Sequence, residues 1–103
     1  MILLWFRVIY VVPKQNKEET KMWHEGTIGI KVNKGAESKI AHYWVKAYYE
    51  GSEYGIEGGR ISKLQIRING QTVANYDRGW DIEPDENDEA AMIAYSILMQ
   101  EYN

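Results

Sequence analysis

The side chains best suited to chemistry are aromatic rings and cations that share one face of a predicted sheet. Apolar residues alternate with other types along 27–33, 39–50 and 60–68, so successive side chains should point to opposite sides. The side away from the apolar residues carries Lys31, His42, Trp44, Lys46, Tyr48, Lys63, Gln65 and Arg67. Rings that stack on bases, together with cations that contact phosphates, are what single-stranded nucleic acid requires. This face is one candidate binding surface.

A competing interpretation is that these rings are covered. Large aromatic surfaces seldom stay bare, so we favour burial of Trp44 and Tyr48 under the N-terminal segment or a second copy of the chain. A homodimer fits this interpretation, because exposed strand edges invite pairing. The face is available for a ligand only if residues 1–21 do not pack on it.

A small anion site is the second candidate. Arg60 enters and Arg78 leaves the same predicted hairpin, which brings them to one end with Tyr76 and Trp80 beside them. Residues 51–59 hold four glycines, as phosphate-binding loops often do. Such loops lead into a helix whose N-terminus faces the anion, whereas this one leads into a strand. We therefore interpret the glycines as requirements of a wide turn.

Charge is distributed unevenly along the chain. Residues 1–78 hold all 12 Lys and Arg against 8 Asp and Glu, a net charge of +4, whereas residues 79–103 hold 7 acids and no base, a net charge of −7. Acids near a helix start stabilise the helix, which is one explanation of the cluster at 81–89. The other is a patch that faces a basic macromolecule. Its candidate contact residues are Trp80, Asp81, Glu83 and Asp85.

Catalytic patterns are weak in this sequence. The chain has no cysteine and 2 histidines, which excludes a thiolate zinc site and a cysteine nucleophile and disfavours other metal chemistry. Asp77 and Asp81 could form a carboxylate pair, but we interpret them as turn and cap residues. A small enzyme or ligand site around Tyr76, Asp77, Arg78 and Trp80 is kept as an alternative. We expect no enzymatic activity, no cofactor and no metal.

The elements that position these groups follow from periodicity. Strands are predicted over 27–33, 39–50, 60–68 and 71–77, and Asn69-Gly70 predicts a type I′ hairpin turn because both positions need positive φ. The sheet is expected to end at 78–81. A length of 103 residues is enough for one domain.

A C-terminal helix is predicted from about 86 to 101, with Asp85 as its candidate cap. Its apolar stripe recurs at helical spacing and should cover the apolar side of the sheet. The predicted fold is α+β: an antiparallel four-stranded meander, five-stranded if the N-terminal segment joins it, covered on one face by this single helix.

The N-terminal segment has two interpretations. Residues 2–12 are apolar except for Arg7, and 11 residues are too few to cross a bilayer, for which about 20 are needed. They also lack the pattern of a secretory signal, so we expect a cytoplasmic protein. Residues 1–21 are either an extra strand or a translated leader that precedes a start at Met22. Residues 22–103 are then the single α+β domain.

Three motifs carry a resemblance to a known family. They are MWHEG at 22–26, EYGIEGGRISKL at 53–64 and ANYDRGWD at 74–81. From Met22 onward the chain resembles a family of small proteins of unknown function from Gram-positive bacteria, their phages and mobile elements. The resemblance implies a bacterial or phage cytoplasmic setting, and it implies no activity and no catalytic residue.

The sequence therefore favours a non-enzymatic accessory protein that binds a macromolecule, with an unknown protein as partner. Its expected contact surfaces are the acidic segment with Trp80 and the end of the hairpin that carries Arg60 and Arg78. The first alternative is a single-stranded nucleic-acid binder, and the second is the small enzyme. A membrane partner is not expected.

Overall fold

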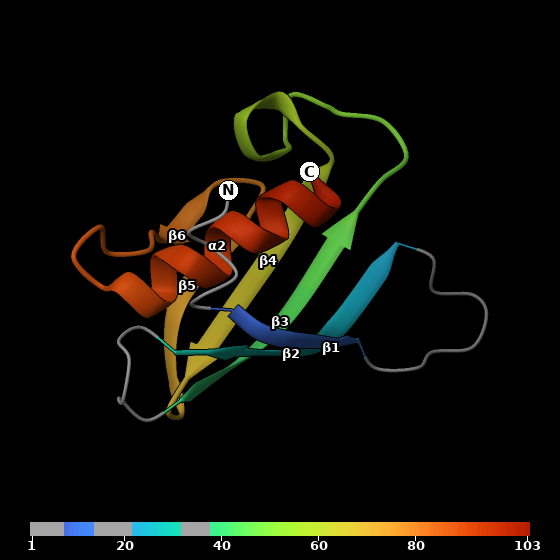
Figure 1. Cartoon of the computed structure of the whole chain (residues 1–103). Helices are drawn as coiled ribbons and strands as arrows, with labels where there is room; N and C mark the ends of the chain where they lie inside the picture. Colours follow the sequence, from blue (N-terminus) through green and yellow to red (C-terminus); the bar gives the residue numbers. More distant parts are fainter. Residues whose placement is uncertain (1–7, 14–21, 32–37) are drawn as a thin grey trace.

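The chain folds as one antiparallel sheet with a helix across one of its faces (Figure 1). A computed structural model describes residues 8–13, 22–31 and 38–103. The strands are β1 (Val8–Pro13), β2 (Trp23–Ile30), β3 (Lys39–Ala47), β4 (Ile61–Ile68), β5 (Gln71–Asp77) and β6 (Trp80–Ile82), followed by the helix α2 (Glu89–Tyr102). They are hydrogen-bonded in the order β1-β2-β3-β4-β5-β6. The predicted α+β meander with one C-terminal helix is confirmed.

The β4–β5 hairpin turns where the sequence predicts. Asn69 has a φ of 55° and Gly70 a φ of 78°, so both central positions are left-handed as a type I′ turn requires. The resulting register places Gln65 opposite Asn75 and Lys63 opposite Asp77.

One face of the sheet forms the core together with α2. Tyr43, Val45, Leu64 and Ile66 are each at most 1% exposed. They pack with Ala90, Ala91, Ile93, Ala94 and Leu98 of the helix. Burying one such large side chain contributes about 1.5–3 kcal/mol. The alternation predicted from the sequence therefore holds in β3 from Ala41 onward and in β4 from Leu64 onward, where every second residue is buried.

The sheet extends beyond the predicted end. Instead of stopping at 78–81, the chain turns at Arg78, which has a φ of 59°, and returns as β6 beside β5. The backbone N–H of Asp77 donates to the carbonyl of Gly79, which closes the turn. The sheet thus has six strands, one more than the five expected if the N-terminal segment joins it.

The helix begins later than predicted. α2 starts at Glu89, and the side chain of Asp88 accepts a hydrogen bond from the backbone N–H of Ala91 at 3.1 Å. The prediction of Asp85 as the cap is wrong. Its carboxylate accepts instead from the N–H of Asn87, which forms a turn just before the helix.

At the N-terminus, β1 pairs antiparallel with β2 at the edge of the sheet. Residues 1–7 and 14–21 lie outside the described part of the chain, and so does Val32, which the sequence places on the apolar face. Pairing of a second copy along a sheet edge stays a prediction.

The glycine-rich loop between β3 and β4 is tied to the end of α2, and the two lie close together in Figure 1. The Asn103 side chain accepts from the N–H of Ile61 at 2.8 Å and donates to the carbonyl of Ile56 at 3.1 Å. At Gly55 a β-carbon would collide with the carbonyl of Gly59. The loop therefore needs glycine for close backbone contact, as the turn interpretation requires.

Replacing the Asn103 side chain should loosen this loop. Asn103→Ala leaves a part-buried N–H and a carbonyl without their partner, which should lower the free energy of unfolding by about 1–3 kcal/mol. Urea denaturation measures the loss. The exposed Gln100 of the same helix supplies the control, since Gln100→Ala should change stability by about 0.5 kcal/mol or less. Equal losses in the two variants would contradict this role of Asn103.

Candidate binding face

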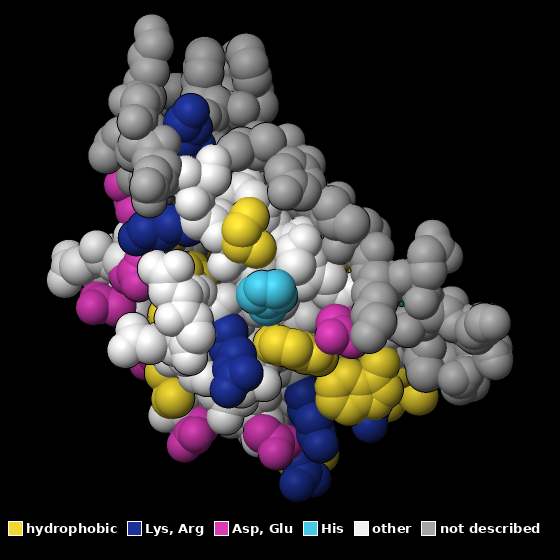
Figure 2. Space-filling view, turned by 90° about the horizontal axis from the view of Figure 1, so that it is seen from below, with side chains coloured by type: hydrophobic (Ala, Val, Ile, Leu, Met, Phe, Trp, Pro, Cys, Tyr) yellow, Lys and Arg dark blue, Asp and Glu magenta, His cyan; other side chains and the backbone are white. Residues whose placement is uncertain are grey.

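The face of the sheet away from α2 gathers the aromatic and basic side chains that the sequence places together. The register sets His42 opposite Arg67 and Trp44 opposite Gln65 on β3 and β4. Figure 2, which looks at the molecule from below, shows Lys and Arg side chains around hydrophobic groups and a histidine, with acidic groups nearby. Lys31 directly follows β2, at the end of the face that His42 and Arg67 also approach.

Two lysines lie directly opposite each other on this face. Lys46 of β3 pairs with Lys63 of β4. Like charges in such a cross-strand pair are destabilising. The Lys46 ammonium offsets part of this cost because it lies 5.6 Å from the centroid of the Trp23 ring and 5.4 Å from that of Tyr48. The Lys46 ammonium thus lies beside two aromatic rings, whereas the Lys63 ammonium lies 3.9 Å from Asp77 Oδ1.

Trp23 is a residue of this face that the sequence does not predict. The first regular strand is predicted to begin at residue 27, whereas β2 begins at Trp23, which lies opposite Lys46. The alternation could have been extended to Trp23, because it lies two residues before Glu25 and four before Thr27 and so points to the same face of the strand. Trp23 is 41% exposed. It lines a pocket together with Trp44 and shares the Lys46 ammonium with Tyr48.

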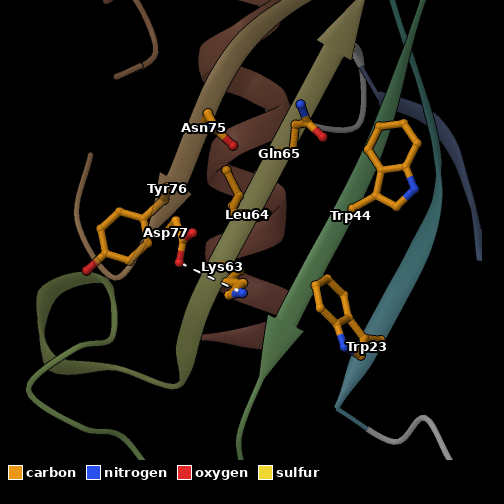
Figure 3. A pocket seen from close by; sticks show the side chains of 8 residues that line it. All are labelled: Trp23, Trp44, Lys63, Leu64, Gln65, Asn75, Tyr76 and Asp77. Carbon is orange, nitrogen blue, oxygen red and sulfur yellow. Dashed lines mark ion pairs between the residues drawn. The ribbon is translucent and has the colours of Figure 1, made fainter. Parts of the chain in front are cut away.

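The first hollow on the face, the tryptophan pocket, has a volume of 200 Å³ (Figure 3). It is lined by Trp23, Trp44, Lys63, Leu64, Gln65, Asn75, Tyr76 and Asp77. In Figure 3 the two tryptophans lie on one side, Asn75 and Asp77 on the other, and Gln65 and Lys63 between them. Leu64 and Tyr76 belong to the core by their side chains and form the floor of the pocket. An aromatic wall thus faces a polar one.

The second hollow, the loop pocket, has a volume of 480 Å³ and lies beside the first. Its lining is Lys46, Tyr48, Glu50, Ser52, Tyr54, Ser62, Lys63 and Arg78. Three cations against one carboxylate give it a positive balance. Lys63 lines both pockets, so they form one continuous surface.

The cations here are only loosely neutralised. Asp77 Oδ1 lies 3.9 Å from Lys63 Nζ and 3.7 Å from Arg78 Nε, with all three side chains at least 42% exposed. Exposed ion pairs of this kind contribute about 0–1 kcal/mol. Both cations can therefore turn toward an anionic ligand at little cost.

The hairpin end does not unite every residue that the sequence groups there. Arg78 lines the loop pocket, whereas Arg60 is not among its lining residues, and the Arg60 carbonyl accepts from the N–H of Tyr48. Tyr76 and Trp80 point to the helix side. Their rings meet edge to face at 5.0 Å, and Trp80 contacts Tyr95 in the same way at 5.7 Å.

The residues of the enzyme alternative are therefore divided between the two sides of the sheet. Tyr76 is 7% exposed and donates its hydroxyl to the carbonyl of Tyr54, while Asp77 and Arg78 are exposed. In the parts of the chain that the structure describes, no three His, Asp or Glu side chains form a group that could hold a metal ion.

Several carboxylates of the acidic segment have local roles. Asp88 caps α2, Asp85 holds the preceding turn, and Asp81 accepts from the side-chain amide of Asn75 at 3.2 Å. Glu83 is exposed and contributes to the field at Tyr95. The pKa of the Tyr95 hydroxyl is raised, first by burial and then by nearby Glu57 and Glu83.

The fold and this face define a small α+β domain in which α2 covers one sheet surface and, among the described residues, no element covers the other, which we call the open face. Whether residues 1–7 and 14–21 pack on it falls outside the described part of the chain. A family model described as a domain of unknown function, DUF7678, matches residues 22–103, so the chain belongs to that family. Comparison with curated proteins and with solved structures gave no match. Among the described residues, no helix combines the length and apolar character needed to cross a membrane.

The local roles of the acids predict unequal effects of their removal. Asp88→Ala should lower the free energy of unfolding by about 1 kcal/mol, because the N–H of Ala91 loses its acceptor. Glu86→Ala, at an exposed position of the same segment, should change it by about 0.5 kcal/mol or less. Thermal or urea unfolding measures both. If Glu86→Ala costs as much as Asp88→Ala, net negative charge rather than capping governs this segment.

Proposed function

We propose that this domain binds single-stranded nucleic acid on the open face of its sheet and acts without catalysis. The observation that carries the proposal is the Lys46–Lys63 pair set among Trp23, Trp44 and Tyr48. Two like charges that face each other across neighbouring strands lower the stability of the sheet. A bound anion would neutralise them and remove this cost. The rings beside them supply surfaces on which bases can stack.

The rings are accessible and separated. Trp23 is 41%, Tyr48 39% and Tyr54 54% exposed. Trp23 and Trp44 lie on neighbouring strands and are offset by one cross-strand pair, a diagonal of about 7–8 Å. The rings thus offer more than one stacking surface along the face. Base–aromatic stacking contributes about 1–3 kcal/mol for each base and tolerates any sequence.

The cations supply the contacts to the phosphates. Lys46, Lys63 and Arg78 line the loop pocket, and Arg67 continues the row along β4. Lys46, Lys63 and Arg67 form a row along β3 and β4. Asp77 and Asp81 lie to one side of this row, on β5 and β6, whereas Glu50 lines the loop pocket and Glu25 lies opposite Trp44. A strand that follows this row would pass over the rings while its backbone stays near the positive side chains.

A protein partner that binds the acidic segment is the competing proposal. It is less well supported, because Asp85 and Asp88 are engaged in the turn and the cap and Trp80 packs against the core. Catalysis around Tyr76 and Asp77 is also less well supported, because their side chains lie on different sides of the sheet. The proposed setting, the cytoplasm of Gram-positive bacteria or their phages, rests on the sequence resemblance alone.

Fluorescence anisotropy with labelled oligo(dT) and oligo(U) of about ten nucleotides tests the proposal. Affinity should fall as salt rises. The slope of log K against log salt should approach roughly −3 if all four cations contact phosphates, at about −0.7 for each contact. Lys63→Gln should make this slope about 0.7 less steep. An absence of binding at low salt would contradict the proposal.

Matched variants distinguish binding at this face from nonspecific attraction by the charge of the protein. Lys39 is exposed and lies on the same strand as Lys46, but its side chain starts from the other face of the sheet. Lys39→Gln should therefore leave the salt slope unchanged. Trp44→Ala should weaken binding by about 1–3 kcal/mol, and Trp44→Phe should retain most of the affinity because it keeps a ring. Circular dichroism checks that each variant is folded. Equal effects of Lys39→Gln and Lys63→Gln would assign any binding to net charge instead of this face.

A further inference from the structure

We propose that the tryptophan pocket is a base subsite that selects guanine within a bound strand. This inference rests on the proposed function, because it assigns one base position on the same face. It follows from the polar wall of the pocket, where Asp77 and Asn75 face Trp23 and Trp44 (Figure 3).

The size of the pocket suits a single flat ring system. Its volume is 200 Å³, below the about 300–1,000 Å³ of pockets that take larger organic ligands. Trp44 lies opposite Gln65, and Gln65 lies opposite Asn75, so three neighbouring strands form the site. A base that stacks on a tryptophan ring can direct its edge toward β5.

The side of the pocket formed by Asn75 and Asp77 of β5, which the edge of the base would meet, is rich in hydrogen-bond acceptors. A carboxylate such as Asp77 only accepts hydrogen bonds. Asn75 donates its amide N–H to Asp81 Oδ2 at 3.2 Å, which leaves its own Oδ1 as an acceptor. Both ion pairs of Asp77 involve Oδ1, at distances too long for hydrogen bonds, so its Oδ2 takes no part in them. The pocket thus presents at least two acceptors side by side.

Guanine is the base whose hydrogen-bond donors match the acceptors on this side of the pocket. Its Watson–Crick edge places the N1–H and the N2 amino group next to each other, and a carboxylate can accept from both. Adenine and cytosine present one amino group beside an acceptor nitrogen, and thymine or uracil presents one N–H between two carbonyl oxygens, which would face the carboxylate unfavourably. The O6 of guanine can accept from the amide of Gln65 or the ammonium of Lys63, which line the same pocket.

The position of Lys63 connects this base to its phosphate. Lys63 lines both pockets, so a nucleotide with its base in the tryptophan pocket has its phosphate near the loop pocket with Lys46 and Arg78. The two pockets then accommodate one nucleotide unit of the strand.

Short oligo(dT) strands that carry one central dG, dA or dC test the inference by anisotropy. The dG strand should bind about fivefold or more tighter than oligo(dT), and the dA and dC strands should not. In Asp77→Asn the ratio of dG to oligo(dT) affinity should fall to near one. The ratio is the decisive quantity, because loss of a negative charge strengthens binding of every strand alike.

Glu53→Gln is the matched control, since it removes an exposed carboxylate that lines neither pocket and should leave the ratio unchanged. Binding of oligo(dT) with no preference for dG would overturn the inference and leave the proposed function standing. If no strand binds, guanosine monophosphate is titrated while tryptophan fluorescence is followed. Saturable quenching that Asp77→Asn abolishes would still support the subsite, and no response would overturn both proposals.

Discussion

One-sided burial is the constraint on which this structure depends. A single helix of 14 residues covers one face of the sheet, so the core side chains of the described strands point to that face, whereas Trp23 and Trp44 lie on the other. Small residues are part of this core on both sides, with Ala41 and Ala74 on the sheet and Ala91 and Ala94 on the helix. The opposite face has no such cover from α2. Its rings and cations are therefore placed by the same alternation that builds the core.

A local irregularity turns this open face into a shaped site. Between β3 and β4 the register shifts, so that Lys46 pairs with Lys63 and Ala47 with Ile61, which leaves Ser62 as the extra residue. Ser62 is 5% exposed, and its hydroxyl donates to the carbonyl of Lys46 at 3.4 Å. Bulges bend a strand and redirect side chains, and they are common near functional sites. Here the bulge lies where the two pockets meet.

Much of the fold was predictable because it follows from short-range patterns. Period-two alternation located the buried face, and Asn69-Gly70 located the hairpin through its need for positive φ. The bulge at Ser62 and the three-residue β6 leave no periodic signal, so the pockets and the inward position of Trp80 could not be foreseen. Asp85 and Asp88 are the same residue type three positions apart, and only the observed start of α2 decides which of them is the cap.

The central claim is that the open face, and not the helix side, contacts the ligand. The most direct measurement follows the tryptophan indole N–H signals by two-dimensional NMR while a single-stranded oligonucleotide is added. The account predicts that the signals of Trp23 and Trp44 shift in a saturable manner while that of Trp80, packed between Tyr76 and Tyr95, stays in place. Shifts confined to Trp80 and residues of α2, or no shifts at all, would contradict it.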